Sequence, residues 1–275
     1  MRLVSLVALC LGLATPAMAQ SGCGTDLPCD IPSGGYRIAL PEGKGPFPVV
    51  LFLHGYGGSA TGTMRGGMAR AAQARGYAFI VPEALVRPGR NRTSWGFHPD
   101  FPGPRNEADF LQEVMQDASA RFGIDPTRSL LTGFSIGGSL ASYIACARPD
   151  DFTAYAPVSG SFWRPHPEGC AGPVRLLHTH GWRDQVVPLE GREIRPGFVQ
   201  GDVFHAMDLW RTANACARHY PDKFETDGDF WRRVWLDCAP GSALELALFD
   251  GGHGMPRGWS NMALDWFEAQ IGPTQ

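Results

Sequence analysis

The feature that most restricts the fold of this chain is an alternation that starts at Phe47. Short, continuous apolar segments alternate with longer segments in which apolar residues recur at helical spacing. Residues 48–53 and 78–81 are continuous apolar runs, whereas residues 107–122 place apolar side chains three and four positions apart. A short, wholly apolar run is typical of a strand buried on both faces, and such strands belong to parallel sheets covered by helices. We therefore expect an α/β fold with a mainly parallel sheet and helices on both faces.

The same patterns predict the order of elements along the chain. The expected strands cover residues 48–53, 78–81, 129–132, 154–158, 174–178 and 244–249, and the expected helices cover residues 64–75, 107–122, 139–147, 203–218 and 261–271. Residues 231–236 are a candidate antiparallel strand that leaves the main strand order, an excursion. Residues 244–249 are expected to form the last strand and so to close the sheet.

The first residues have the pattern of an export signal. Arg2 provides a positive charge, residues 3–13 are apolar, and residues 17–19 form a small-residue cleavage site. We expect a signal peptide at 1–19 and one mature catalytic domain at 20–275, secreted or periplasmic. The apolar run is about half of the roughly 20 residues that cross a bilayer, so no membrane span is expected. A lipid anchor on Cys23 is less favoured, because Gln20 stands where lipoprotein processing usually takes an aliphatic residue.

The charge balance excludes one class of partner. The chain has 24 Lys plus Arg against 27 Asp plus Glu, a net charge of −3, so no broad basic surface for nucleic acid is expected. The expected partner is a small-molecule or oligomeric substrate, and the oligomeric state stays open.

Six cysteines follow the expected signal peptide, and an even number in an exported chain indicates disulfides. We expect pairing between neighbours along the chain, although the sequence does not choose among the pairings. The expected pairs are Cys23 with Cys29, Cys146 with Cys170, and Cys216 with Cys238. No C-x-x-C pair or His-rich cluster is present, so no metal site is expected.

Gly133-Phe134-Ser135-Ile136-Gly137 is a G-x-S-x-G motif between a predicted strand and a predicted helix. In that context the motif predicts a tight turn of the α/β-hydrolase type, in which the glycines remove side chains that would collide and the serine hydroxyl is exposed at the sheet edge. By itself the pentapeptide also fits a chance match with Ser135 as a helix N-cap. The flanking elements favour Ser135 as a nucleophile.

A serine nucleophile needs a base within hydrogen-bond reach and a carboxylate that orients the base, and in this fold the acid precedes the histidine. His253 follows the last expected strand in a glycine-rich segment and is the predicted base, whereas His205 and His219 lie in or just after a helix. Asp184 follows the expected strand at 174–178 and is the predicted acid. Asp250 is the alternative, although its position also suits a cap of the turn below His253.

Two backbone amides are predicted to stabilise the negative charge that develops on the substrate oxygen. Ile136 supplies one, directly after Ser135, and Tyr56 supplies the other from the glycine-rich segment 54–59 after the first expected strand. A plain glycine-rich turn is the alternative for this segment. The Gly-Lys-Ser/Thr ending of a phosphate-binding P-loop is missing, and His54 is expected to brace the loop.

Four tryptophans fall in segments predicted to leave the active edge as loops: Trp95, Trp163, Trp182 and Trp259. As a group they predict an apolar or aromatic acyl site, whereas any one of them also fits ordinary loop packing.

Matching motifs extend over most of the chain, from Cys29 to Trp266. They are residues 36–41, 53–59, 133–138, 145–150 and 156–160, His180-Gly-x-x-Asp184 with Val187-Pro188, and Trp210 with Cys216. Together they resemble the polyhydroxybutyrate depolymerase-like and feruloyl esterase-like group of secreted α/β-hydrolases. The resemblance implies cofactor-free hydrolysis of carboxylic esters through an acyl-enzyme on Ser135, with His253 and Asp184. Two departures concern the acyl pocket: Met255 and Pro256 follow His253 where similar proteins often have His-x-Trp-Pro, and Trp182 replaces a smaller residue.

The expected substrates are polyhydroxybutyrate-type oligoesters or feruloyl and short-acyl esters. No polymer-binding module is evident, so we expect soluble esters to be cleaved better than insoluble polymer. The three side chains do not distinguish esters from amides, and a peptidase or amide hydrolase on the same fold stays open. A catalytically silent binding protein is the rival class, against which the complete set of Ser135, His253 and Asp184 argues.

Overall fold

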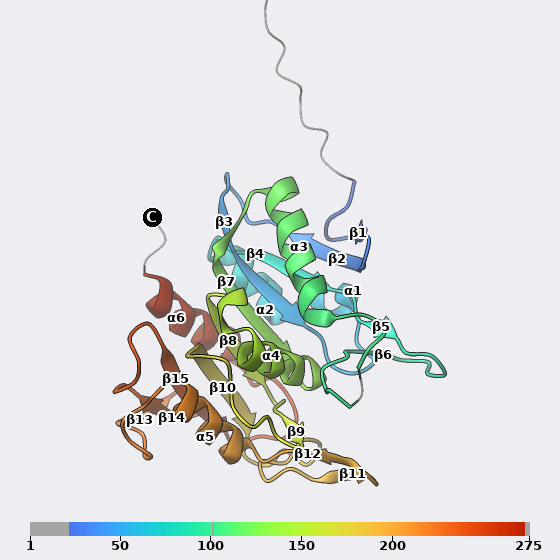
Figure 1. The fold of residues 1–275 in the computed structure, drawn as a ribbon. Coiled ribbons are helices and arrows are strands. Elements are labelled where there is room, and N and C mark those ends of the chain that lie inside the picture. The colour runs from blue at the N-terminus through green and yellow to red at the C-terminus, as the bar shows by residue number, and fades with distance from the viewer. Residues whose placement is uncertain (1–21, 101, 273–275) are drawn as a thin grey trace, which may run out of the picture.

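A ten-stranded sheet runs through the centre of the protein in the order β1-β2-β4-β3-β7-β8-β10-β15-β14-β13 (Figure 1). The computed structural model describes residues 22–100 and 102–272, and the expected signal peptide at 1–19 lies outside the described residues. The six central strands run parallel: β4 (Ala78–Pro82), β3 (Phe47–Leu53), β7 (Ile124–Phe134), β8 (Ala154–Val158), β10 (Arg175–Gly181) and β15 (Ala243–Phe249). This is the predicted α/β architecture.

Antiparallel strands extend the sheet at both edges. β1 (Cys29–Ile31) and β2 (Gly34–Ala39) flank β4, while β14 (Phe230–Trp235) and β13 (Lys223–Asp227) flank β15. The predicted excursion at 231–236 is therefore β14. The expectation that residues 244–249 close the sheet is wrong, because β14 pairs with the free side of β15 and covers its backbone groups.

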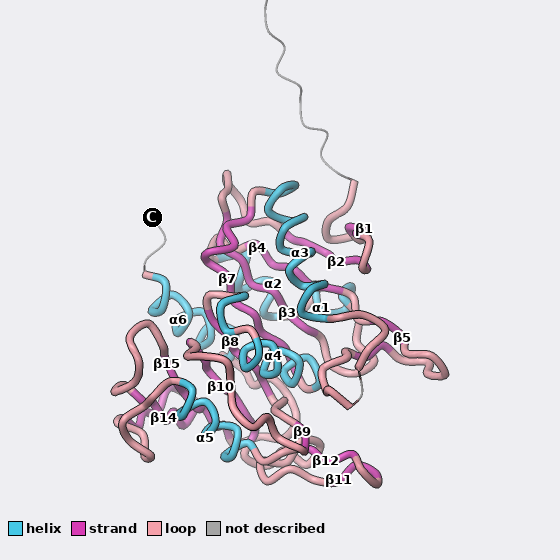
Figure 2. The backbone as a smooth tube through the Cα atoms, viewed as in Figure 1, coloured by secondary structure: helices cyan, strands magenta, loops and turns pink. Residues whose placement is uncertain are grey.

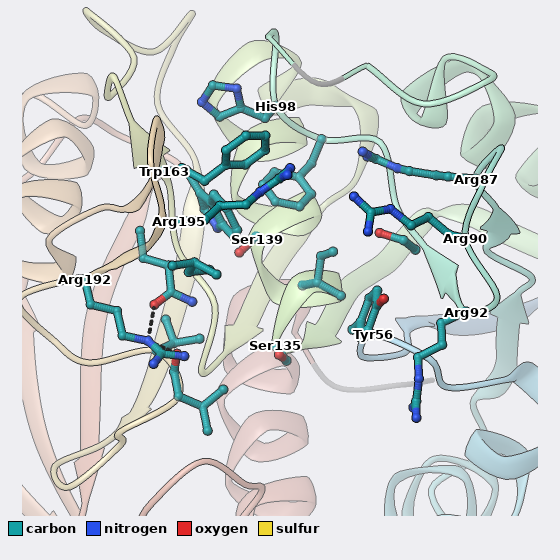
Figure 3. Close-up of a pocket in the computed structure, with 18 residues that line it drawn as sticks. Tyr56, Arg87, Arg90, Arg92, His98, Ser135, Ser139, Trp163, Arg192 and Arg195 are labelled. Atoms are coloured by element: carbon teal, nitrogen blue, oxygen red, sulfur yellow. Dashed lines mark hydrogen bonds between the residues drawn. The ribbon is translucent and has the colours of Figure 1, made fainter.

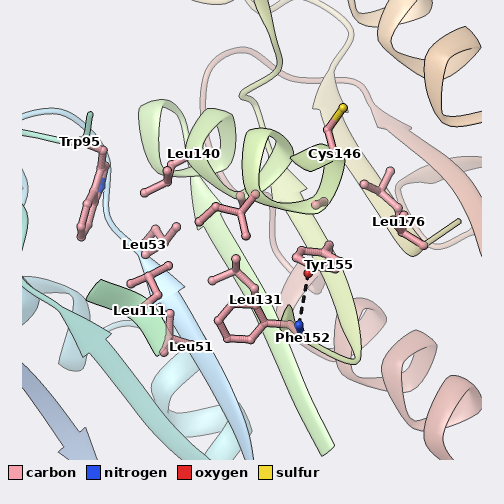
Figure 4. Packing of buried hydrophobic residues seen from close by; sticks show 14 of the residues in the cluster. Leu51, Leu53, Trp95, Leu111, Leu131, Leu140, Cys146, Phe152, Tyr155 and Leu176 are labelled. Atoms are coloured by element: carbon pink, nitrogen blue, oxygen red, sulfur yellow. Dashed lines mark hydrogen bonds between the residues drawn. The ribbon is translucent and has the colours of Figure 1, made fainter. Parts of the chain in front are cut away.

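Two helical layers cover the sheet and explain the wholly apolar strands. α3 (Glu107–Phe122), α4 (Ile136–Ala147) and α5 (Val203–Ala213) pack on one face, and α1 (Ala60–Met64), α2 (Gly67–Ala74) and α6 (Trp259–Ile271) pack on the other. Every residue of β4 and β8 is buried between these layers. Figure 4 shows the first face, where Leu51 and Leu131 of the sheet meet Leu140 of α4. A short 3-10 helix at Pro149–Asp151 follows α4.

Two predicted helices have different lengths in the structure, each for a local reason. The helix predicted at 64–75 begins later, as α2 at Gly67–Ala74, because Gly66 takes an extended conformation at its N-cap, and Met64 instead ends the separate helix α1. The helix predicted at 203–218 ends at Ala213, because the Asn214 side chain turns away to bond the backbone N–H and carbonyl of Val174. Cys216 then enters a disulfide.

Two small sheets lie apart from the main sheet, among the loops (Figure 2). β5 (Leu85–Val86) and β6 (Thr93–Ser94) form one, and β11 (Glu193–Arg195), β12 (Phe198–Gln200) and β9 (Trp163–Arg164) form the other. The sequence analysis placed no strands in these segments.

The structure contains the three disulfides given by pairing neighbours along the chain. They join Cys23 to Cys29, Cys146 to Cys170 and Cys216 to Cys238. Within the described residues, no helix is long and apolar enough to span a membrane.

Candidate active site

The carboxyl ends of four parallel strands bring the predicted site residues to one edge of the sheet. Tyr56 follows β3, Ser135 follows β7, Asp184 follows β10 and His253 follows β15. In open α/β sheets this edge is where ligands bind, because successive loops converge there. Residues separated by more than a hundred positions therefore meet in one place.

The turn that carries Ser135 is strained. Ser135 has φ 57° and ψ −122°, a backbone conformation that residues other than glycine rarely adopt. A Cβ on Gly137 would lie 2.2 Å from the Leu53 carbonyl oxygen, and a Cβ on Gly133 would lie 2.6 Å from the Gly137 backbone. Only glycine fits at both flanks, so the motif lets strand, turn and helix approach closely enough to present the hydroxyl.

A continuous hydrogen-bonded relay joins the three predicted catalytic side chains. His253 Nε2 lies 2.9 Å from Ser135 Oγ, and His253 Nδ1 lies 2.8 Å from Asp184 Oδ2. An ionised carboxylate can only accept hydrogen bonds, so Nδ1 carries the proton and donates it to Asp184. Nε2 then has a free lone pair that accepts the Ser135 hydroxyl proton.

Asp184 is held as a buried carboxylate by its neighbours. Its Oδ1 accepts hydrogen bonds from the N–H groups of Val186 and Val187, at 2.9 and 2.8 Å. Burial by itself raises the pKa of Asp184, but the hydrogen bonds from His253 and Val187 outweigh it, and the net pKa lies below the usual value. Asp184 is therefore ionised and oriented at neutral pH.

His180 supports the loop that carries the acid. Its Nε2 lies 2.7 Å from the Val187 carbonyl oxygen, so it donates to that carbonyl, and its Nδ1 lies 3.0 Å from His178 Nε2. Burial lowers the pKa of both imidazoles, so these histidines are neutral structural groups. The sequence motif His180-Gly-x-x-Asp184 thus corresponds to a brace followed by the residue it positions.

The alternative candidates lie outside the relay. Asp250 forms an exposed ion pair with Arg183 at 3.0 Å, and His205 packs its ring against His166. The backbone carbonyl of His219 accepts a hydrogen bond from Trp235 Nε1. None of the three side chains contacts Ser135, so the geometry favours His253 and Asp184.

The two predicted oxyanion donors, Ile136 and Tyr56, follow β7 and β3 at the same edge of the sheet. Ile136 is the first residue of α4, where a helix leaves backbone N–H groups without an intrahelical acceptor. The amide of Tyr56 makes no hydrogen bond within residues 22–100 and 102–272. His54 braces this loop: its carbonyl accepts a hydrogen bond from Trp95 Nε1 at 2.8 Å, and burial lowers the pKa of its imidazole.

A cavity of about 380 Å³ opens beside Ser135 (Figure 3). Ser135, Ile136 and Tyr56 line one part of it, so the nucleophile and both candidate oxyanion donors face the same space. Much of the remaining wall is apolar and includes Phe97, Trp163, Val187, Ile194 and Phe198. The cavity is large enough for a small acyl group with an aromatic or aliphatic body.

Of the four predicted substrate-binding tryptophans, only Trp163 lines this cavity. The prediction is wrong for Trp95 and Trp259, which are 0% and 1% exposed. Trp95 packs beneath the His54 loop, and Trp259 Nε1 donates to Thr179 Oγ1 from the start of α6. Trp182 is 55% exposed and does not contribute to the cavity wall.

The sequence analysis missed the arginines of the cavity. Arg87, Arg90 and Arg92 come from the turn between β5 and β6, and Arg192 and Arg195 come from around β11. The available signal was a pair of arginine-rich Pro-Gly segments, at 87–92 and 192–197. Among the described residues, no group of three or more His, Cys, Asp or Glu side chains is arranged to hold a metal ion.

Comparisons with known proteins identify esterases. A family described as "Putative esterase" matches residues 33–188. The probable feruloyl esterase C of Aspergillus terreus is 28% identical over 269 residues, which are 90% of this chain and 89% of that protein. The putative esterase NocK of Nocardia uniformis subsp. tsuyamanensis is 33% identical over 164 residues, which are 58% of this chain and 45% of that protein.

The fold has counterparts among solved structures. The acetyl xylan esterase from Aspergillus awamori aligns with a TM-score of 0.63 at 16% identity, over 85% of this chain and 93% of that chain. At this identity the likeness concerns the fold alone, which is the α/β-hydrolase fold.

Proposed function

Because this chain belongs to the putative esterase family and is a carboxylic ester hydrolase, we propose that it works through a serine acyl-enzyme formed on Ser135. The observation that carries the proposal is the relay from Ser135 Oγ through His253 to Asp184, with distances of 2.9 and 2.8 Å. These distances lie in the range needed for proton transfer in the ground state.

In the first half-reaction His253 Nε2 takes the Ser135 hydroxyl proton while Oγ attacks the ester carbonyl. The tetrahedral oxyanion is stabilised by the N–H groups of Ile136 and Tyr56, and Asp184 stabilises the imidazolium. When the intermediate collapses, the bond to the alcohol oxygen breaks and His253 gives its proton to that oxygen. In the second half-reaction His253 takes a proton from water, hydroxide attacks the acyl-enzyme, and Ser135 recovers its proton as the acid leaves.

The proposed substrates are soluble esters with a short or aromatic acyl group, including feruloyl-type esters and hydroxybutyrate-type oligoesters. The apolar lining around Phe97 and Trp163 supports this choice, because it suits a flat or compact body. The feruloyl esterase names of relatives such as the Aspergillus terreus protein point the same way.

We also propose that the protein is exported, with cleavage after residue 19. Three disulfides support this, because such bonds persist in oxidising compartments. Terminal sequencing of the mature protein tests the proposal, since export with this signal predicts Gln20 as the first residue. A mature chain that retains residues 1–19 would contradict it.

The test of the mechanism compares wild-type protein with Ser135→Ala and with the control Ser242→Ala. The Ser242 hydroxyl lies outside the cavity and donates to the Ala239 carbonyl. We expect Ser135→Ala to lose hydrolysis of p-nitrophenyl butyrate by several orders of magnitude, and to lose labelling by a fluorophosphonate probe, with an unchanged melting temperature. Ser242→Ala should behave as wild type. Substantial turnover by Ser135→Ala would remove this serine from the mechanism.

A panel of methyl ferulate, hydroxybutyrate dimers and trimers, and peptides tests the substrate class. Cleavage of peptides without cleavage of esters would favour the amide hydrolase alternative.

A further inference from the structure

The charged side chains of the cavity beside Ser135 are all of one sign. Of its 18 lining residues, five are arginines and none is Asp or Glu, although acidic residues outnumber basic ones in the whole chain. Four of these arginines are exposed and Arg87 is half-buried, so their like charges remain partly solvated, and together they give the space a positive potential that attracts an anion. The lining therefore points to an anionic group on whatever fills the cavity.

The arginines approach from two separate elements. Figure 3 shows Arg87, Arg90 and Arg92 on one side of the cavity and Arg192 and Arg195 on the other, with Ser135 between them. Three sequence-distant elements, the β5–β6 turn, the segment around β11 and the turn after β7, thus enclose one space. An anion that enters it meets guanidinium groups from both walls.

Contacts within the protein orient several of these guanidinium groups. Arg87 Nη2 donates to the Trp95 carbonyl at 2.8 Å, and Arg192 Nε donates to the Val186 carbonyl at 3.0 Å. The Arg195 guanidinium lies over the Phe198 ring, 3.4 Å from its centroid. A guanidinium fixed in this way loses less conformational entropy when it binds an anion.

Four of the five cavity arginines have a charge that is available to a ligand. Arg90, Arg92, Arg192 and Arg195 form no ion pair with a carboxylate in the described part of the chain. The Asp184 carboxylate is already engaged by His253 and two backbone amides, so it is not a partner for these arginines.

The rest of the lining limits what the anion is attached to. Phe97, Trp163, Ile194 and Phe198 give the cavity an apolar wall, and Ser135 with the candidate oxyanion amides occupies one part of it. The matching ligand has a scissile ester, an apolar spacer and a charged terminus. Carboxylate is the fitting charge, because guanidinium groups bind it with two parallel hydrogen bonds.

We propose that this hydrolase selects esters that carry a free carboxylate, such as half-esters of dicarboxylic acids or hydroxy-acid oligoesters with a free acid end, and that Arg90 and Arg195 determine this preference. The inference rests on the proposed function, because it assigns the charge of the substrate cleaved at Ser135.

Matched ester pairs test the proposal. p-Nitrophenyl hemiadipate and p-nitrophenyl hexanoate have acyl chains of equal length and differ only in the terminal carboxylate, so the ratio of their kcat/KM values isolates the charge. A second pair, the butyrate ester of hydroxybutyrate with its carboxylate free or methylated, places the charge on the alcohol side. We expect the charged ester to be preferred in at least one pair.

The variants are Arg90→Gln, Arg195→Gln and their combination, with the charge-retaining Arg90→Lys and Arg195→Lys for comparison. In the double glutamine variant the charged-to-neutral ratio should fall by about tenfold, the size expected for two partly exposed charge pairs, and the lysine variants should keep most of it. Arg70→Gln on α2, an exposed arginine outside the cavity, should keep the wild-type ratio. Raising NaCl from about 0.02 M to about 0.5 M should lower the wild-type ratio, because it shortens the screening length from about 20 Å to about 4 Å.

The outcomes are separable. A lowered ratio with the hemiadipate pair places the carboxylate on the acyl side, and a lowered ratio with the hydroxybutyrate pair places it on the alcohol side. Ratios that the glutamine variants and salt leave unchanged in both pairs would overturn the proposal, even if both esters are cleaved. Failure to cleave any of the four esters would instead contradict the proposed function.

Discussion

The replacement Asp184→Asn separates orientation from charge at the proposed acid. Asparagine has nearly the same shape as aspartate, but one of its two terminal atoms is a donor. The Asp184 Oδ1 position accepts hydrogen bonds from Val186 and Val187, whereas the Oδ2 position accepts one from His253. The outcome depends on which position the new amide nitrogen occupies.

The structure decides the orientation. If the nitrogen faced Val186 and Val187, three donors would meet and two hydrogen bonds would be lost, at a cost of about 2 kcal/mol or more. The oxygen therefore stays with the two amides and the nitrogen faces His253. His253 Nδ1 must then accept, so its proton moves to Nε2, which can no longer take the Ser135 proton. A wrong tautomer of this kind lowers kcat by about 10⁴-fold, or about 5.4 kcal/mol of transition-state stabilisation.

The assay is steady-state hydrolysis of p-nitrophenyl butyrate by wild type, Asp184→Asn and the control Asp250→Asn. Asp250 lies three residues before His253 but pairs with Arg183 at the surface, so its replacement should leave kcat within a few-fold of wild type. KM should change little in Asp184→Asn, because Asp184 does not line the cavity. The reasoning fails if Asp250→Asn is the damaging change, or if Asp184→Asn retains near wild-type kcat with its fold intact.

Further changes test the packing around the site. Replacing Cys146 and Cys170 together by serine should lower the free energy of unfolding by about 3 kcal/mol in chemical denaturation, because the bridge closes a loop with a sequence separation of 24; an unchanged midpoint would contradict a structural role. Trp259→Ala should lower the free energy of unfolding by about 3–5 kcal/mol in the same measurement, since the side chain is 1% exposed. Trp163→Ala, at the cavity wall, should mainly raise KM. The reverse pattern would refute the assignment of these two residues. The lowered pKa of Asp184 stabilises the folded state above about pH 4, and this contribution is lost as the pH falls through the folded-state pKa. The melting temperature of wild type should therefore fall more steeply in acid than that of Asp184→Asn, and parallel curves would argue against a carboxylate stabilised by its hydrogen bonds.

Local patterns predicted the central elements of the fold well. The segments 107–122 and 154–158 coincide with α3 and β8, because each has one uninterrupted pattern and a clear boundary. The Asn106 side chain caps the start of α3, and Gly123 ends it in a left-handed conformation. The edge strands β1, β2 and β13 went unpredicted, because they contain polar residues and depend on pairing with neighbours that the local pattern does not reveal.

The proposed catalytic residues were predictable for a related reason. Their order along the chain follows the order of strands, and each of Ser135, Asp184 and His253 stands directly after a strand whose pattern is evident. Burial of single aromatics has no such signal. Trp95 and Trp259 stand near glycines and prolines as exposed loop residues do, and only tertiary packing against His54 and Thr179 puts them in the interior.

The same contrast explains why the proposed specificity residues went unnoticed. The wall that carries Arg195 depends on β12, which pairs Gln200 with Trp163 across a long stretch of sequence, and on β11, which pairs with β12. The opposite wall depends on a two-residue pairing between β5 and β6. Neither small sheet contributes a residue to the relay, whose geometry comes from β7, β10 and β15. If the proposal holds, substitutions on the two small sheets change the preference for a charged ester, while the main sheet keeps Ser135, His253 and Asp184 in place. The charged-to-neutral ratio therefore reports on the two small sheets and does not depend on the geometry of the relay.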